Sequence, residues 1–202
     1  MKKLILSALI VLATAPVAFS QVQLTLYTGY QFGSSTNYYG YQSGRFKVNG
    51  SQDWAAMLSV AARPGTQIEF SYTYMSTSAQ FERAGIIDES VGDVDIHYYQ
   101  IGGVQESNVS ENVDLFGTVA FGGTTFAPKD SRYQNNTFFS IGLGGGLKLW
   151  ISDAIGIRAQ ARLLMPVTWG GLTFGTGGAG ITTGSSIISG DIGGGLIFRF
   201  GN

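Results

Sequence analysis

Apolar and polar residues alternate along most of the chain after Gln21, and this two-residue period predicts β-strands with two unlike faces. The run at 24–32 places Leu24, Leu26, Tyr30 and Phe32 on one face and residues such as Thr25 and Gln31 on the other. Beyond Gln21 no apolar stretch is long enough to span a membrane as a helix. The pattern therefore predicts an all-β fold.

Seven further runs repeat this alternation. We predict strands at 24–32, 53–62, 67–74, 96–104, 113–121, 138–151, 155–163 and 188–200. In the fourth strand the period is weakest, and we expect Tyr99 and Ile101 on the apolar face because the other phase would put Gln100 there. Connections at 63–66, 105–112 and 152–154 are short, whereas those at 33–50, 76–95, 123–136 and 166–186 are long. Alternating long and short connections are typical of an antiparallel up-and-down barrel with long loops at one end.

The distribution of charge indicates which face points inward. Only 12% of the residues are charged, about half the usual share of roughly 25%. The polar face consists mainly of Gly, Ser, Thr, Ala and Gln, which suits the filled interior of an eight-stranded barrel better than a surface in water. The apolar face carries aromatic residues near its ends, as the interfacial girdles of transmembrane barrels do: Tyr30, Phe32, Trp54, Tyr72, Tyr74, Phe121, Phe198 and Phe200. We therefore predict an eight-stranded antiparallel transmembrane β-barrel, with a soluble barrel or sandwich of inverted faces as the alternative.

The N-terminus predicts export. Residues 1–20 combine two lysines, an apolar run and the small residues Ala18 and Ser20 before a cut at Gln21, which is the pattern of a cleaved signal peptide. Residues 21–202 would then form the barrel domain, located in the bacterial outer membrane. The chain has no cysteine, which excludes disulfides, thiolate metal sites and a cysteine nucleophile. The exported part carries more acidic than basic residues, so we expect no nucleic-acid partner.

The signal peptide, the eight strands, the alternating loop lengths and the ending Gly195-Leu-Ile-Phe198-Arg-Phe200 together resemble the small outer-membrane barrels of the OmpA/OmpX type and the related opacity-protein and porin-family barrels. The resemblance covers the whole exported chain. It implies that Gly195, Phe198 and Phe200 form the signal that the barrel-assembly machinery recognises. In this chain Gly201 and Asn202 follow the final aromatic residue, a departure from the commonest ending.

Seven charged residues fall on the polar face, and we expect them to form a structural polar network that fills the lumen: Glu69, Asp114, Lys148, Arg158, Arg162, Asp191 and Arg199. The spacing around the connection at 166–186 brings Arg162 close to Asp191. The spacing around the turn at 152–154 brings Lys148 beside Arg158, so these two cations need Glu69 or Asp114 as counter-ions. An ion pathway is the alternative, but an eight-stranded barrel leaves little bore.

Candidate chemistry is sparse. His97 is the only histidine, and Asp93 and Asp95 precede it. A serine nucleophile with an oriented base would be needed for hydrolysis, and no serine follows His97 at the spacing known from outer-membrane lipid A deacylases. The acidic stretch at 88–95 could hold a divalent cation but is better explained as a solvated loop. We therefore expect no catalytic residues, no cofactor and no metal site.

The long connection after the first strand is rich in interface-forming residues. Aromatic and arginine side chains supply anchors in protein interfaces, and here these are Tyr38, Tyr39, Tyr41, Arg45 and Phe46. The expected partners are outer-membrane lipid and lipopolysaccharide, the barrel-assembly machinery and, through the long loops, an extracellular partner. We expect an envelope structural or surface-interaction protein without a wide channel. The alternatives are a lipid A or acyl-chain-modifying enzyme that uses His97, and a narrow pore or carrier of small hydrophobic ligands.

Overall fold

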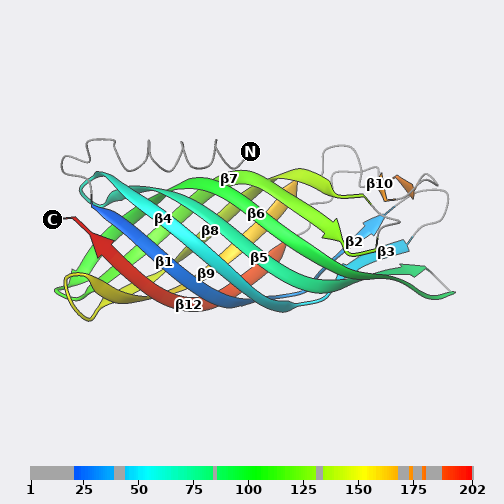
Figure 1. Ribbon diagram of the computed structural model, residues 1–202, viewed down its shortest axis with the longest axis horizontal. Helices are drawn as coiled ribbons and strands as arrows, with labels where there is room; N and C mark the ends of the chain where they lie inside the picture. The colour runs from blue at the N-terminus through cyan, green and yellow to red at the C-terminus, as the bar shows by residue number, and fades with distance from the viewer. Residues whose placement is uncertain are drawn as a thin grey trace, which may run out of the picture.

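The computed structural model describes residues 21–38, 44–83, 86–130, 134–167, 173–174, 179–180 and 188–201. Eight long antiparallel strands form a closed barrel (Figure 1). They are β1 (Val22–Gln31), β4 (Ser51–Arg63), β5 (Thr66–Arg83), β6 (Ile86–Ser110), β7 (Val113–Pro128), β8 (Asn136–Trp150), β9 (Ile155–Val167) and β12 (Ser189–Phe200). The predicted all-β, eight-stranded, up-and-down architecture is confirmed.

The first and last strands close the barrel. β1 pairs with β12 from Val22 opposite Phe200 to Gln31 opposite Asp191, and it pairs with β4 on its other side. Because every strand of the ring has two neighbours, the wall has no open edge that would leave backbone groups unpaired in lipid. β1 begins and β12 ends at the same end of the barrel (Figure 1). Among the described residues no helix is long and apolar enough to cross a membrane.

Three short turns lie at this same end, as predicted. The first contains Pro64 and Gly65, and Gly65 has a φ of 72°, which favours glycine. The second contains Glu111 and Asn112, and the third spans 151–154. We call this the turn end of the barrel and the opposite one the loop end.

At the loop end the strands are longer than predicted. The predicted loop at 76–95 is wrong, because β5 continues to Arg83 and β6 begins at Ile86, and the loop at 123–136 is shorter, because β7 reaches Pro128. The stretch after β1 contains two more strands, β2 (Ser34–Tyr38) and β3 (Gly44–Val48), and β3 pairs with the end of β5. The connection near 166–186 contains the two-residue strands β10 (Thr173–Phe174) and β11 (Ala179–Gly180). Beyond the apolar belt the apolar residues of β5 lie on the inward face, where Met75 and Ala79 are buried, so the outward apolar pattern ends although the backbone pairing continues.

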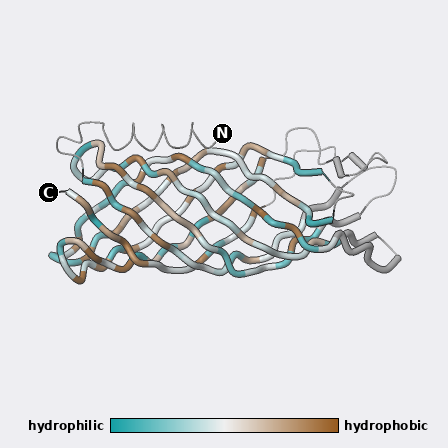
Figure 2. The backbone as a smooth tube through the Cα atoms, viewed as in Figure 1, coloured by the Kyte–Doolittle hydropathy of each residue, from teal (hydrophilic) through white to brown (hydrophobic). Residues whose placement is uncertain are grey.

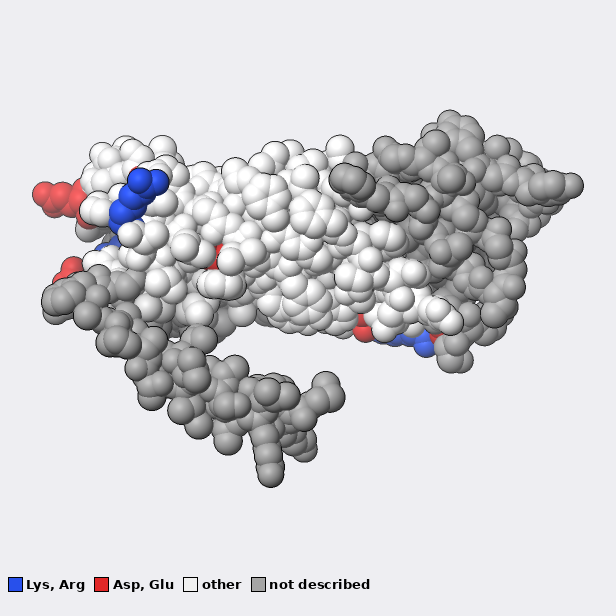
Figure 3. All heavy atoms as spheres, turned by 90° about the horizontal axis from the view of Figure 1, so that it is seen from above, with Lys and Arg blue, Asp and Glu red and all other residues white. Residues whose placement is uncertain are grey.

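The outward faces agree with the prediction. Tyr99 and Ile101 are 53% and 47% exposed and Gln100 is buried, which confirms the phase assigned to the fourth predicted strand. Hydrophobic and hydrophilic positions alternate along the barrel strands (Figure 2). Charged side chains gather near the two ends of the barrel on the face shown in Figure 3, and the band between them is nearly free of charge. The outer surface therefore has the apolar belt that a transmembrane barrel requires.

Candidate functional site

Side chains from opposite walls meet inside the barrel near the turn end. Arg158 of β9 donates from Nη1 to Glu69 Oε2 of β5 at 2.5 Å and from Nη2 to Oε1 at 3.2 Å. Ser59 donates to the same Glu69 oxygen at 2.9 Å. Three strands separate β5 from β9 along the sheet, so this ion pair crosses the lumen. Arg158 is fully buried, and its guanidinium lies over the Phe116 ring at 4.4 Å.

Lys148 lies opposite Arg158 in the β8–β9 register, so the two cations are neighbours, as the sequence predicted. The counter-ion of Lys148 is Glu106 of β6. Lys148 also donates to Gln23 Oε1 of β1 at 2.6 Å, which adds a second contact across the lumen. Arg158 is thus balanced by Glu69, while Lys148 is balanced by a residue that the sequence analysis had placed in a turn.

A second charged cluster lies closer to the middle of the barrel. Arg162 and Asp191 occupy opposite positions on β9 and β12, and Arg162 Nε donates to Asp191 Oδ2 at 2.5 Å. Arg162 also contacts Asp53 of β4 through Nη2 and Oδ2 at 3.3 Å and donates to Thr73 of β5 at 3.1 Å. Tyr27 donates to Asp191 at 3.0 Å. One buried arginine therefore joins four strands and holds two carboxylates.

Glycine at position 29 makes room for this cluster. A Cβ atom there would lie 2.6 Å from Asp191 Oδ1, 2.6 Å from the Tyr27 hydroxyl and 2.8 Å from Asp53 Oδ1. Such contacts are too short for any side chain. The carboxylates can approach the β1 backbone only because Gly29 has no side chain.

The remaining two predicted network residues lie at the turn end of the lumen. Asp114 is buried, accepts a hydrogen bond from Trp150 Nε1 at 2.7 Å and another from Asn108 at 3.1 Å, and so does not serve Lys148. The Arg199 guanidinium is stacked over the Trp150 ring at 3.6 Å. These contacts fasten the ends of β6, β7, β8 and β12 at the mouth of the barrel.

The loop end of the lumen is apolar, which corrects the expectation of a wholly polar filling. Residues of four barrel strands and β3 pack together there, and Phe138 of β8 packs against them: Val48, Met75, Ala79, Val94, Ile96, Tyr98, Phe126 and Leu164. Gln31 lies between the two halves and donates to Tyr98 at 2.8 Å and Ser189 at 3.0 Å. The lumen thus consists of a polar, charged half near the turns and a mainly apolar half near the loops, where Thr77 and Thr124 are also buried.

Sequence reasoning missed Glu106 and Asp53. Asp53 shares the inward phase of β4 with buried Ala55 and Met57, so its alternation with Trp54 was a usable signal. Glu106 was missed because the fourth strand was ended too early.

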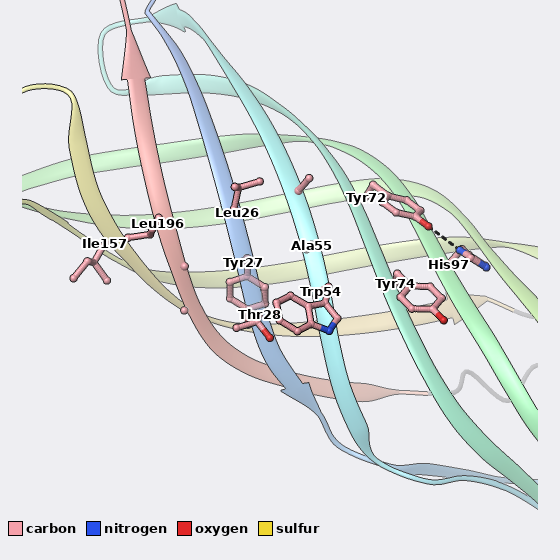
Figure 4. A pocket seen from close by; sticks show the side chains of 13 residues that line it. Leu26, Tyr27, Thr28, Trp54, Ala55, Tyr72, Tyr74, His97, Ile157 and Leu196 are labelled. Carbon is pink, nitrogen blue, oxygen red and sulfur yellow. Dashed lines mark hydrogen bonds between the residues drawn. The ribbon is translucent and has the colours of Figure 1, made fainter. Parts of the chain in front are cut away.

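A groove runs along the outside of the barrel (Figure 4). It has a volume of about 1020 Å³, and its lining is almost entirely apolar. Outward-facing side chains of six strands line it, including Leu26, Trp54, Ala56, Tyr72, Tyr74, His97, Ile157 and Leu196. His97 lies at one end, where its Nδ1 shares a hydrogen bond of 2.9 Å with the Tyr72 hydroxyl. Its ring lies close to those of Tyr72 and Tyr74.

The comparison with solved structures identifies the fold. OprG of Pseudomonas aeruginosa, an outer-membrane protein, has a TM-score of 0.72 at 7% identity, over 91% of this chain and 97% of that one. The outer-membrane protein AlkL has a TM-score of 0.60 at 10% identity, over 94% of each chain. Neisserial surface protein A has a TM-score of 0.55 at 12% identity, over 90% of this chain and 97% of that one. The chain has the fold of the small eight-stranded outer-membrane barrels. Neither a protein-family model nor a curated protein sequence matches it.

In this barrel, the expected assembly residues lie on the closing strand. Gly195 pairs with Tyr27 of β1, Phe198 with Leu24 and Phe200 with Val22. A Cβ at position 195 would collide with the β1 backbone at Leu26, so the closure of the barrel itself requires this glycine. The role of these three residues in assembly stays a prediction.

The candidate surface segment of the barrel lies at the loop end. Tyr38 ends β2, and Arg45 and Phe46 lie on β3, so part of the predicted loop is a β-ribbon. Tyr39 and Tyr41 lie outside the described residues, as does the predicted signal peptide at 1–20.

The acidic stretch near His97 belongs to a strand. Asp95 of β6 is paired with Lys129 at 3.5 Å and accepts a hydrogen bond from Tyr74 at 3.2 Å. Among the described residues no group of three or more His, Cys, Asp or Glu could hold a metal ion.

Proposed function

We propose that this protein is an integral outer-membrane barrel, closed to bulk solutes, with a structural or surface-interaction role in the envelope. The observation that carries the proposal is the set of bonds across the lumen. Arg158 to Glu69, Lys148 to Gln23 and Arg162 to Asp53 each join strands that are not neighbours in the sheet. Side chains fixed in this way fill the space through which solutes would pass.

A surface-interaction role is supported by the loop end. There β2, β3 and the ends of β5 and β6 continue the sheet past the apolar belt (Figure 1). Regular strands beyond the belt give a firm platform for loops, and binding residues are commonly carried by loops on a rigid scaffold. An extracellular partner that contacts this platform is part of the proposal.

The proposed role is non-enzymatic. The group in contact with His97 Nδ1 is the phenol of Tyr72, and the imidazole lies on the outer face of the barrel. Hydrolysis would need a nucleophile within hydrogen-bond reach of the base. The mass spectrum of lipid A from cells with His97→Ala should match that from wild-type cells, and a lost modification would favour the enzyme instead.

A second candidate function is a carrier of small hydrophobic ligands, and the apolar cluster at the loop end of the lumen favours it. Met75, Ile96 and Phe126 would line the entry of such a ligand. Transfer of a fluorescent apolar dye into vesicles that contain the protein tests this role. A rate above that of empty vesicles, reduced by Phe126→Arg, would support it.

Conductance measurements in planar bilayers test the main proposal. We expect the folded protein to give no stable current steps, because the cross-lumen bonds leave no continuous water path. Protein unfolded by boiling is the control for nonspecific leakage. Regular ohmic steps from the folded protein alone would contradict a closed lumen.

A further inference from the structure

The outer groove has a direction relative to the membrane. Ile157 lies two residues after the start of β9, beside a short turn, whereas His97 lies more than a dozen residues before the turn that ends β6. A tilted strand crosses the hydrocarbon in about 9–11 residues. The groove therefore rises from the apolar part of the belt near Ile157 to the interface at the loop end near His97.

Two rows of paired residues shape the groove. In one row Gly194, Thr28, Trp54 and Tyr74 follow one another across four strands, and His97 continues the row on β6. In the other row, Leu196, Leu26, Ala56 and Tyr72 are paired in the same order. Gly194 and Ala56 are small, and the bulky side chains on both sides of them project further from the barrel wall. The hollow is thus built by small residues between large ones on the outward face.

A second outer groove of about 460 Å³ joins the first. Both are lined by Ala56 and Tyr72, and the second continues past Phe70, Ile101 and Phe121. The two grooves form one branched apolar surface. A chain lying in a concave surface touches more atoms than one lying against a convex wall, and each contact adds dispersion energy.

The interfacial end of the groove carries polar groups. The Tyr74 hydroxyl donates to Asp95, and Lys129 lies 3.5 Å from the same carboxylate and donates to Ser76 at 3.1 Å. The Lys129 side chain is 49% exposed, so its ammonium can also meet an anion from outside. A cation and hydroxyls beside the interfacial end of an apolar branched groove match the arrangement of phosphate and acyl chains in a lipid.

We propose that this branched groove is a binding site for one two-chain phospholipid, whose chains lie along Leu26, Ala56 and Tyr72 and whose phosphate lies near Tyr74 and Lys129. The inference rests on the proposed placement of the belt in the membrane. It adds a defined lipid site to a surface that would otherwise contact lipids without preference. Tyr72 and Tyr74, with the His97 ring close to both, form its interfacial rim.

Photolabelling tests this site. The folded protein is reconstituted into phosphatidylcholine vesicles that contain a small fraction of phosphatidylcholine with a diazirine in one acyl chain, irradiated, digested and mapped. We expect the label to concentrate on the segments around Leu26, Ala56 and Leu196, several-fold above the segments around Val119 and Leu143 on other outward faces. In Ala56→Phe, which fills the junction of the two grooves, this excess should fall several-fold.

Ala161→Phe is the matched control, because Ala161 is also exposed on the outward face but does not line either groove. It should leave the labelling pattern of the wild type. Label spread evenly over all outward faces would overturn the proposed lipid site in the groove and leave the membrane placement intact. An absence of label on every outward face would overturn the placement and the groove together. A wild-type dimer in detergent that Ala56→Phe converts to a monomer would assign the groove to a second copy and overturn the lipid site.

Discussion

Arg158 and Glu69 meet across the lumen although they belong to opposite walls, with Nη1 and Oε2 2.5 Å apart and both side chains buried. This ion pair fixes the distance between β5 and β9 inside the barrel. It lies beside the Lys148–Glu106 pair, so the turn half of the lumen is held by two linked ion pairs.

Removing one partner of this ion pair should lower the stability of the barrel. Glu69→Ala leaves the Arg158 guanidinium buried without its carboxylate, and the expected loss is about 3–5 kcal/mol of unfolding free energy. Urea titration of the protein in lipid vesicles, followed by the mobility of the folded band, measures it. The double variant Glu69→Leu with Arg158→Met should recover most of the loss, because no charge is then left unpaired. A single variant as stable as the wild type would contradict this role of Glu69.

The two carboxylates that share Arg162 should differ in how much each contributes to the stability of the barrel. Asp191 accepts hydrogen bonds from Arg162 at 2.5 Å and from Tyr27, whereas Asp53 lies 3.3 Å from the same guanidinium. Asp191→Asn should therefore destabilise the barrel more than Asp53→Asn, which removes a second negative charge from beside the first. The same urea titration compares them, and the reverse order would show that Asp53 is the main partner of Arg162.

Gly29→Ala should disrupt the central cluster. The new methyl group would press on Asp191, Tyr27 and Asp53, and overpacking of this kind costs about 1–3 kcal/mol or more. Gly117→Ala is the control, since a Cβ at position 117 meets no atom within 4 Å. Equal stability of the two variants would mean that the cluster can move away from the β1 backbone.

Because of the apolar belt, the loss of unfolding free energy caused by an introduced charge should depend on its position along a strand. Val119 is exposed in the middle of β7, and Val109 is exposed beside a turn. Val119→Arg should lower the unfolding free energy in vesicles by about 2–4 kcal/mol, and Val109→Arg by about 1 or less, because the cost of arginine falls toward the interface. If Val119→Arg costs no more than Val109→Arg, the outer face of β7 does not lie in hydrocarbon.

The sequence predicted those features that follow from a local two-residue period and from the pairing of strands joined by one connection. Outward residues such as Ile68 and Phe70 were recognised because the polar residues Gln67, Glu69 and Ser71 flank them on the same strand. The position of Arg162 opposite Asp191 could be predicted because a single connection joins their strands.

Other features depend on how the barrel closes. The contact of Arg158 with Glu69 and that of Lys148 with Gln23 join distant strands. The stagger between strands in the closed sheet decides which residues of opposite walls lie at the same height in the lumen. The apolar half of the lumen was missed because Val94 lies in a segment read as a loop. β3 was missed although Arg45, Phe46, Lys47 and Val48 alternate between polar and apolar, because five residues within a Tyr- and Gly-rich stretch make too short a pattern to separate from a loop.

The most direct test of the account is the mobility of unboiled and boiled protein on a detergent gel, together with fractionation of the expressing cells. We predict that the protein is found in the outer-membrane fraction and that the unboiled sample runs as a separate, compact band, because a closed barrel resists unfolding by detergent. A protein in the soluble periplasmic fraction with the same mobility before and after boiling would contradict the lipid-facing barrel.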